Sequence, residues 1–238
     1  IIISNILYLI LYMENLKLIS LKIFFLLLLS IYISSFVSAA WTPIIHHYTP
    51  KNYEAGTQNW DIVEQANGWM YIANNYGLLE TDGCRWNLYG INNSSALRSV
   101  TLDNEGNIYV GGTDEFGVFV ADGLGRLKYE NLSMYVPSSY RNFGEVWRLQ
   151  VAEDKLYIQT RHYIFIYKKD EGIEVIDPGA IIYESLIWEG NLYVATSRDL
   201  YVQSGGRLHA LRGAESLHNI VVCGLFPYGK EGMMIATD

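Results

Sequence analysis

The sequence predicts an all-β protein, a β-propeller of four-stranded blades. The first observation is an internal repeat. Altered copies of NGWMYIANNYGLLETDG (67–83) occupy 105–123, 153–170 and 189–206, and a fifth begins at 230–238. The second observation is the spacing of equivalent positions, which is 38, 48, 36 and 41 residues along the series Tyr71, Tyr109, Tyr157, Tyr193 and Met234. Self-similarity with a period near 40 residues is typical of propeller blades.

Each copy is expected to supply its strands in the same order. An apolar run such as LRSVTLD gives the first strand, and a turn rich in Asn, Gly, Asp and Glu follows it. Such turns suit tight hairpins. A second strand such as NIYVGG, another polar turn and a third strand such as GVFVAD come next, and RLKYENL is a fourth. Val, Ile, Tyr and Trp are favoured on a pleated, half-buried surface. The sequence therefore predicts four blades and the first half of a fifth.

The first forty residues differ from the repeats. Residues 1–12 precede the first methionine, Met13, and are interpreted as upstream read-through. Residues 13–40 read as a signal peptide, because two lysines, Lys17 and Lys22, precede an apolar run (23–33) and small residues follow it. An uncleaved anchor is the alternative, although a spanning helix needs about 20 apolar residues. Residues 41–238 are then an incomplete propeller domain with a periplasmic, extracytoplasmic location.

The two ends of the repeat region suggest a longer protein. Ile44–Tyr48 reads as one outer strand that lacks the other strands of its blade, and the chain stops after the second strand of the fifth blade. Propellers commonly close by completing one blade with strands from both termini, so the partners of this strand are expected beyond Asp238. Unpaired edges would promote aggregation. The sequence is therefore interpreted as the N-terminal fragment of a larger chain.

Charge and motifs exclude several classes of function. The net charge of −8 leaves no basic surface for nucleic acid. No catalytic or metal-binding motif occurs, so neither a catalytic residue, a metal nor a cofactor is predicted. Cys84 and Cys223 are expected to be separate thiols, with a disulfide as the alternative.

The turns between second and third strands hold the candidate ligand-binding residues. In a propeller these turns emerge on the face that usually carries the binding site. Amides, carboxylates and guanidinium groups suit a polyhydroxylated or uronate sugar. The structural alternative is that such turns need polar residues in any case. The candidates are Asn74, Asn75, Asp114, Glu115, Arg161, His162, Arg198 and Asp199.

The tryptophans allow a second interpretation, carbohydrate stacking. Trp60, Trp147 and Trp188 fall in predicted first strands, which pack between blades, so we expect them in the core. Trp69 lies in a predicted hairpin turn, where it could be exposed.

Two stretches resemble a known family. YEAGTQNWDIVEQANGWMYIANNYGLLETDGCRWNLY (53–89) and GNIYVGGTDEFGVF (106–119) are similar to the first two blades of the two-component-regulator propeller family. These repeats form the periplasmic sensor of large regulators found mostly in Bacteroidetes. The resemblance implies a seven-bladed propeller, a following β-sandwich, a transmembrane helix and a cytoplasmic output module.

The resemblance leads to one functional expectation and two alternatives. The chain is expected to be the extracytoplasmic ligand-sensing module of a transmembrane regulator of transcription, with a glycan fragment as ligand and no enzymatic activity of its own. The full-length protein is expected to be a homodimer that meets the membrane only through a C-terminal helix. The alternatives are an exported propeller enzyme acting on polysaccharide and a protein-interaction propeller.

Overall fold

The computed structural model describes residues 19–24, 26–27, 43–229 and 232–238. It divides into two compact units, Ile1–His47 and Tyr48–Asp238. In the first unit, residues 19–24 and 26–27 are helical. Within the described ranges, no helix is long and apolar enough to cross a membrane. Most of the predicted signal peptide, including its cleavage region, lies outside the described residues and stays a prediction.

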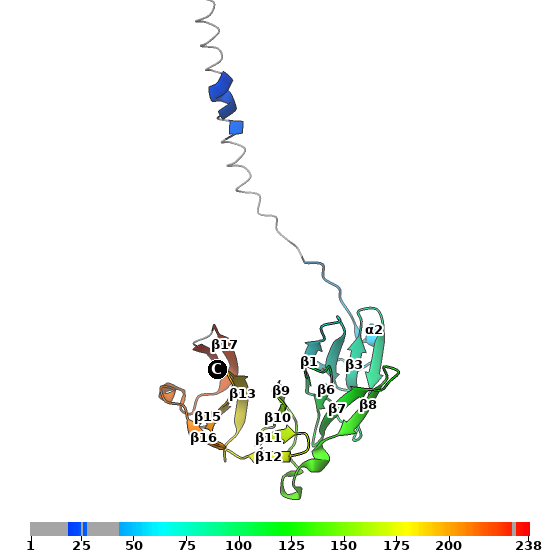
Figure 1. The fold of residues 1–238 in the computed structure, drawn as a ribbon, viewed down its shortest axis with the longest axis vertical. Coiled ribbons are helices and arrows are strands. Elements are labelled where there is room, and N and C mark those ends of the chain that lie inside the picture. The colour runs from blue at the N-terminus through cyan, green and yellow to red at the C-terminus, as the bar shows by residue number, and fades with distance from the viewer. Residues whose placement is uncertain (1–18, 25, 28–42, 230–231) are drawn as a thin grey trace, which may run out of the picture. The chain divides into compact units, whose positions relative to one another are not determined.

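The second unit consists of antiparallel sheets whose strands follow chain order (Figure 1). Blade 1 is β1 (Asn59–Glu64), β2 (Met70–Asn74), β3 (Gly77–Thr81) and β4 (Trp86–Tyr89). Blade 2 is β5 (Ser99–Leu102), β6 (Ile108–Gly111), β7 (Phe116–Ala121) and β8 (Leu127–Asn131). Blade 3 is β9 (Arg148–Ala152), β10 (Lys155–Gln159), β11 (Ile164–Lys168) and β12 (Gly172–Ile176). Blade 4 is β13 (Ile182–Trp188), β14 (Asn191–Thr196), β15 (Leu200–Ser204) and β16 (Arg207–Ala210).

A fifth, two-stranded sheet pairs β17 (Val222–Tyr228) with β18 (Gly232–Thr237). The predicted four blades and the first half of a fifth are thus confirmed. In the described part of the second unit, short helices lie outside the strands: α2 (Pro50–Tyr53), η1 (Ser133–Tyr135), η2 (Ser138–Tyr140) and η3 (Glu215–Leu217).

The blades stand side by side in chain order. The first strand of each blade packs against the first strand of the next, β1 on β5, β5 on β9, β9 on β13 and β13 on β17. Figure 1 shows β1, β9 and β13 on the inner side and the fourth strands β8, β12 and β16 on the outer side. We call the end of a blade at which the chain enters its first strand the entry end. The opposite end, where a hairpin joins the first and second strands, is the hairpin end.

The hydrophobic core lies between neighbouring blades. Blades 1 and 2 bury Leu78 against Phe119, and blades 2 and 3 bury Phe116 against Phe165. Ile164 and Ile182 belong to the cluster between blades 3 and 4. Blades 2, 3 and 4 therefore bury their two faces on their neighbours, as in other repeat proteins in which a single unit has no core of its own.

The same irregularity recurs at the start of three first strands. Register shifts occur between Asn59 and Asp61 in β1, between Ile182 and Glu184 in β13, and between Val222 and Gly224 in β17. A bulge of this kind bends the strand and re-aims the side chains beside it. It places Trp60 and Asp61 together at the entry end of blade 1.

The predicted outer strand over Ile44–Tyr48 is not confirmed. Residues 43–49 carry no strand, and Ile44 and Ile45 are 87% and 83% exposed. Within the second unit, the Tyr48 hydroxyl donates to the carbonyl of Gly83 at 3.1 Å. Tyr53 of α2 is buried against the ring of Trp86, 5.4 Å away.

Candidate functional site

The turns between second and third strands lie at the entry end and connect each blade to the next. In every blade a backbone carbonyl at this turn accepts a hydrogen bond from a backbone N–H of the segment that leads to the following blade. The four bonds are Leu97 to Asn74 (3.1 Å), Val146 to Gly112 (2.9 Å), Ile182 to Arg161 (2.8 Å) and Asn219 to Arg198 (2.9 Å). Three of the predicted residues, Asn74, Arg161 and Arg198, therefore have a structural role through their backbone, whatever their side chains do.

Two of the predicted ligand contacts are buried. The Asn74 side chain is fully buried, its Nδ2 donates to the carbonyls of Gly56 (2.7 Å) and Gln58 (3.1 Å), and its Oδ1 accepts from two backbone N–H groups. The buried carboxylate of Glu115 accepts from the backbone N–H groups of Asn92 and Asn93 at 3.1 and 3.0 Å. Both side chains hold loops in place.

The remaining predicted residues are more accessible. Asp114 accepts from the Gly144 N–H at 2.6 Å, and Asp199 lies 2.9 Å from Nδ1 of His218. Arg161, His162 and Arg198 have exposed side chains at the turns of blades 3 and 4. Asn75 is half-buried and lies in a cluster whose other members the sequence did not single out as ligand contacts.

That cluster joins three blades at the entry end. Arg98, just before β5, donates from Nη1 to Oδ1 of Asn75 at 3.0 Å and from Nε and Nη2 to Oε1 of Glu145 at 3.0 and 2.9 Å. Its guanidinium carbon lies 4.2 Å from the ring centroid of Trp60 and 6.0 Å from that of Trp147. The two indoles are 6.2 Å apart, edge to face. We call Trp60, Asn75, Arg98, Glu145 and Trp147 the inner rim.

The inner rim corrects the prediction for two tryptophans. Trp60 and Trp147 were expected in the core, but they are 42% and 39% exposed. Trp60 Nε1 donates to Asn75 Oδ1 at 2.8 Å, so its ring is fixed although half of it is accessible. Trp188 follows the prediction, since it is partly buried at the other end of its strand against Tyr193. Aligning NWDIVE, LRSVTL and VWRLQVA would have placed Trp60, Arg98 and Trp147 at one position of the repeat.

An ionic layer lies next to the inner rim. Arg148 Nη2 is 2.8 Å from Oε2 of Glu184, and the positive charge of Arg148 also acts on Asp61. Asp61 accepts from the backbone N–H of Val100 at 3.0 Å. Burial raises the pKa of the Asp61 carboxyl above its ordinary value, although the N–H groups of Val100 and Ile62 and the charge of Arg148 oppose the change. Burial also raises the pKa of Glu184, again opposed by Arg148.

The raised pKa values of Asp61 and Glu184 predict that the free energy of unfolding falls as pH rises above about 4. A carboxyl whose pKa is higher in the folded state keeps its proton longer there, so its stabilising effect is present below the unfolded pKa and is lost through the folded pKa. Asp61→Asn keeps an acceptor for the Val100 N–H and removes the titration. We expect the decline above about pH 4 to become shallower in this variant, as measured by urea denaturation across pH.

Asp82 and Asp122 do not mask this effect. Turn N–H groups lower the pKa of Asp82 and Asp122, so their contribution to stability changes only below their ordinary value of 3.8. An unchanged slope above about pH 4 in Asp61→Asn would contradict the assignment of that slope to Asp61.

The two cysteines are not paired. Cys84 and Cys223 are both free and exposed, which confirms the prediction of separate thiols. Among the described residues, no three His, Cys, Asp or Glu side chains gather closely enough to hold a metal ion.

Comparison with solved structures shows that the fold is a β-propeller. The WD40 β-propeller domain of Doa1 aligns with a TM-score of 0.58 at 13% identity, over 77% of this chain and 62% of that domain. Virginiamycin B lyase from Staphylococcus aureus aligns with a TM-score of 0.58 at 11% identity, over 78% and 64%. No protein-family model and no curated protein matches the chain.

Two further structures are of extracellular domains. Both are of BT4673 from B. thetaiotaomicron, described in one as a one-component and in the other as a hybrid two-component system. They align with TM-scores of 0.57 and 0.61 at 18% and 17% identity, over 79% and 76% of this chain. The chain spans only 27% and 26% of their length, about a quarter of each domain.

Proposed function

We propose that this chain is part of the extracytoplasmic sensor of a transmembrane regulator of the two-component-regulator propeller family. The sequence runs at 53–89 and 106–119 support this proposal, as does the structural similarity to the extracellular domains of BT4673. The output module of such a regulator would control transcription from the other side of the membrane. The chain itself acts in this proposal as a binding module, working within a homodimer.

The proposed ligand is a glycan fragment bound at the entry end. The single observation that carries this proposal is the pair of half-exposed indoles, Trp60 and Trp147, fixed beside Arg98. Aromatic faces bind apolar sugar faces, and Tyr or Trp rings combine large contact area with little loss of side-chain freedom. The exposed guanidinium groups of Arg161 and Arg198 would supply bidentate contacts to a uronate carboxylate.

The proposed signal is a population shift. A ligand that stacks on Trp60 and Trp147 contacts blade 1 and the start of blade 3 at once, so its affinity depends on how these blades are arranged. A ligand can change an equilibrium between two arrangements only by binding one of them more tightly. Bound glycan would therefore favour one arrangement of the paired sensors, and the membrane helix would transmit that preference.

A binding experiment with matched tryptophan variants tests the proposal. Neutral and uronate-containing oligosaccharides would be titrated into the purified chain, with calorimetry and tryptophan fluorescence as readouts. Trp147→Ala should weaken binding about tenfold, the loss of one aromatic contact. Trp69→Ala is the control, because Trp69 lies in the hairpin between β1 and β2, at the opposite end of blade 1.

The variants also separate the parts of the proposed site. Arg161→Ala combined with Arg198→Ala should weaken binding of uronates and leave neutral sugars unaffected. Unchanged affinity in a folded double variant would remove both arginines from the site. Equal losses in Trp147→Ala and Trp69→Ala would contradict the proposed position of the ligand. Depolymerisation of a polysaccharide by the wild-type chain would instead favour the exported enzyme.

A further inference from the structure

A cavity of about 570 Å³ opens at the hairpin end, between blades 2 and 3. This is the end opposite to the inner rim, so the cavity is separate from the site proposed above. Its floor is apolar and continues into the core between these blades, with Val118 and Val120 from β7, Val151 from β9 and Leu156 from β10. Small-molecule sites in proteins typically have this size and an apolar lining with a few polar groups.

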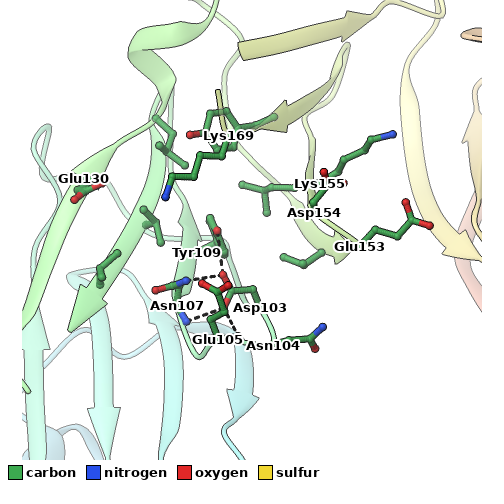
Figure 2. A pocket seen from close by; sticks show the side chains of 16 residues that line it. Asp103, Asn104, Glu105, Asn107, Tyr109, Glu130, Glu153, Asp154, Lys155 and Lys169 are labelled. Atoms are coloured by element: carbon green, nitrogen blue, oxygen red, sulfur yellow. Dashed lines mark hydrogen bonds between the residues drawn. The ribbon is translucent and has the colours of Figure 1, made fainter. Parts of the chain in front are cut away.

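The mouth of the cavity is charged, as Figure 2 shows. Asp103 is held by neutral donors, since its Oδ1 accepts from the N–H groups of Glu105 and Asn107 and its Oδ2 accepts from Asn107 Nδ2 and the Tyr109 hydroxyl. Its negative charge is therefore not compensated by these bonds. Asp154, in contrast, forms an ion pair with Lys168 at 3.1 Å.

The other charges at the mouth leave it negative. Glu105, Glu130 and Glu153 line it together with Lys155 and Lys169. With Asp103 included and the Asp154–Lys168 pair set aside, four carboxylates and two ammonium groups line the mouth. The negative electrostatic potential at the mouth of this apolar cavity favours binding of a cation and disfavours binding of an anion.

Two tyrosine rings form part of the wall. The hydroxyl of Tyr109 donates to Asp103 at 3.2 Å, and its ring faces the cavity in Figure 2. The ring of Tyr167 stacks on Tyr135 with centroids 6.1 Å apart. Aromatic faces attract ammonium groups by cation–π interaction, so these rings add to the preference for a cation.

We propose that this cavity is a second ligand site, which takes a small organic amine: an apolar, ring-sized body enters between the sheets and the ammonium group stays among the carboxylates at the mouth. The site is independent of the proposed glycan site. Failure of the amine proposal would not affect the glycan proposal, and the reverse also holds, because the residues of the two sites lie at opposite ends of the blades.

Three compounds of similar shape and different charge test the proposal: 2-phenylethylamine, 2-phenylethanol and 3-phenylpropanoate. Binding to the purified chain would be measured by ligand-observed NMR and calorimetry at millimolar concentration. We expect the amine to bind at least tenfold more tightly than the carboxylate, with the alcohol between them. Added salt should reduce the difference, because it screens charges at an open mouth.

Three variants locate the bound amine. Val151→Phe fills the floor and should abolish binding, while Glu130→Gln should weaken the amine severalfold and leave the alcohol unchanged. Glu174→Gln is the matched control, because Glu174 is exposed on β12 and does not line the cavity. Equal binding of the three compounds, or no binding of the amine, would overturn the proposal. So would amine binding that a folded Val151→Phe variant retains.

Discussion

Replacing Asn74 by alanine is expected to lower the free energy of unfolding by about 3 kcal/mol. The side chain is fully buried, and its loss leaves the carbonyl of Gly56 and the N–H groups of Gly56 and Tyr76 without this partner. It also removes one of the two donors to the carbonyl of Gln58, which keeps the N–H of Asn75. Each buried group left unsatisfied carries its own desolvation cost. Urea denaturation would measure the change.

Two comparisons make this result specific. Asn142→Ala removes an exposed asparagine and should change stability by less than about 0.5 kcal/mol. Asn74→Asp keeps the acceptor for the two N–H groups but turns an anionic oxygen toward carbonyl groups, so it should be at least as destabilising as alanine. A small effect of Asn74→Ala would contradict the structural role assigned to this amide.

Replacing Gly77 by alanine is expected to cost about 4 kcal/mol. Gly77 is the first residue of β3 and has φ of +138°, a conformation that residues with a Cβ rarely adopt. An added Cβ would also overlap the carbonyl oxygen of Tyr89, in the neighbouring strand β4. The first three strands would have to move away from the fourth. We expect a large loss of thermal stability in calorimetry.

Gly68→Ala isolates the backbone part of this effect. Gly68 has φ of +87° but no atom near the position of an added Cβ. Its substitution should therefore cost about 1 kcal/mol, the strain of the left-handed conformation alone. Equal effects at Gly68 and Gly77 would contradict the steric explanation.

The blades could be predicted from the sequence because their determinants are local. Alternating apolar residues and the polar turns between them recur with one period, and each hairpin needs only its own two strands to form. The strand over Ile44–Tyr48 was predicted from its sequence and its place before the first blade, with its partners expected beyond Asp238. The structure has no strand there. A strand forms only where a neighbouring strand can pair with it, and the local sequence pattern does not supply that neighbour.

The candidate site was harder to predict because it depends on distances between blades. Asn74 and Asn75 are neighbours of the same type, yet one is fully buried and the other belongs to the inner rim. Trp60 lies in β1 and Trp147 directly before β9, where burial was expected, and the two half-exposed rings contact each other across blade 2. Arg98 lies inside the run LRSVTLD, which predicts a first strand, and its contacts with both tryptophans depend on how the blades pack.

The contact between Trp60 and Trp147 affects the order in which the blades are expected to separate during unfolding. A row of repeats in which each contacts only its neighbours has a stability that is a sum of single-repeat and nearest-neighbour terms. The indole pair adds a second-neighbour term, since it connects blade 1 to the start of blade 3, and Arg98 of blade 2 lies against both rings. Three blades then share one cooperative unit at the entry end, while the fourth is joined to that unit through blade 3 and can separate from it as an independent step.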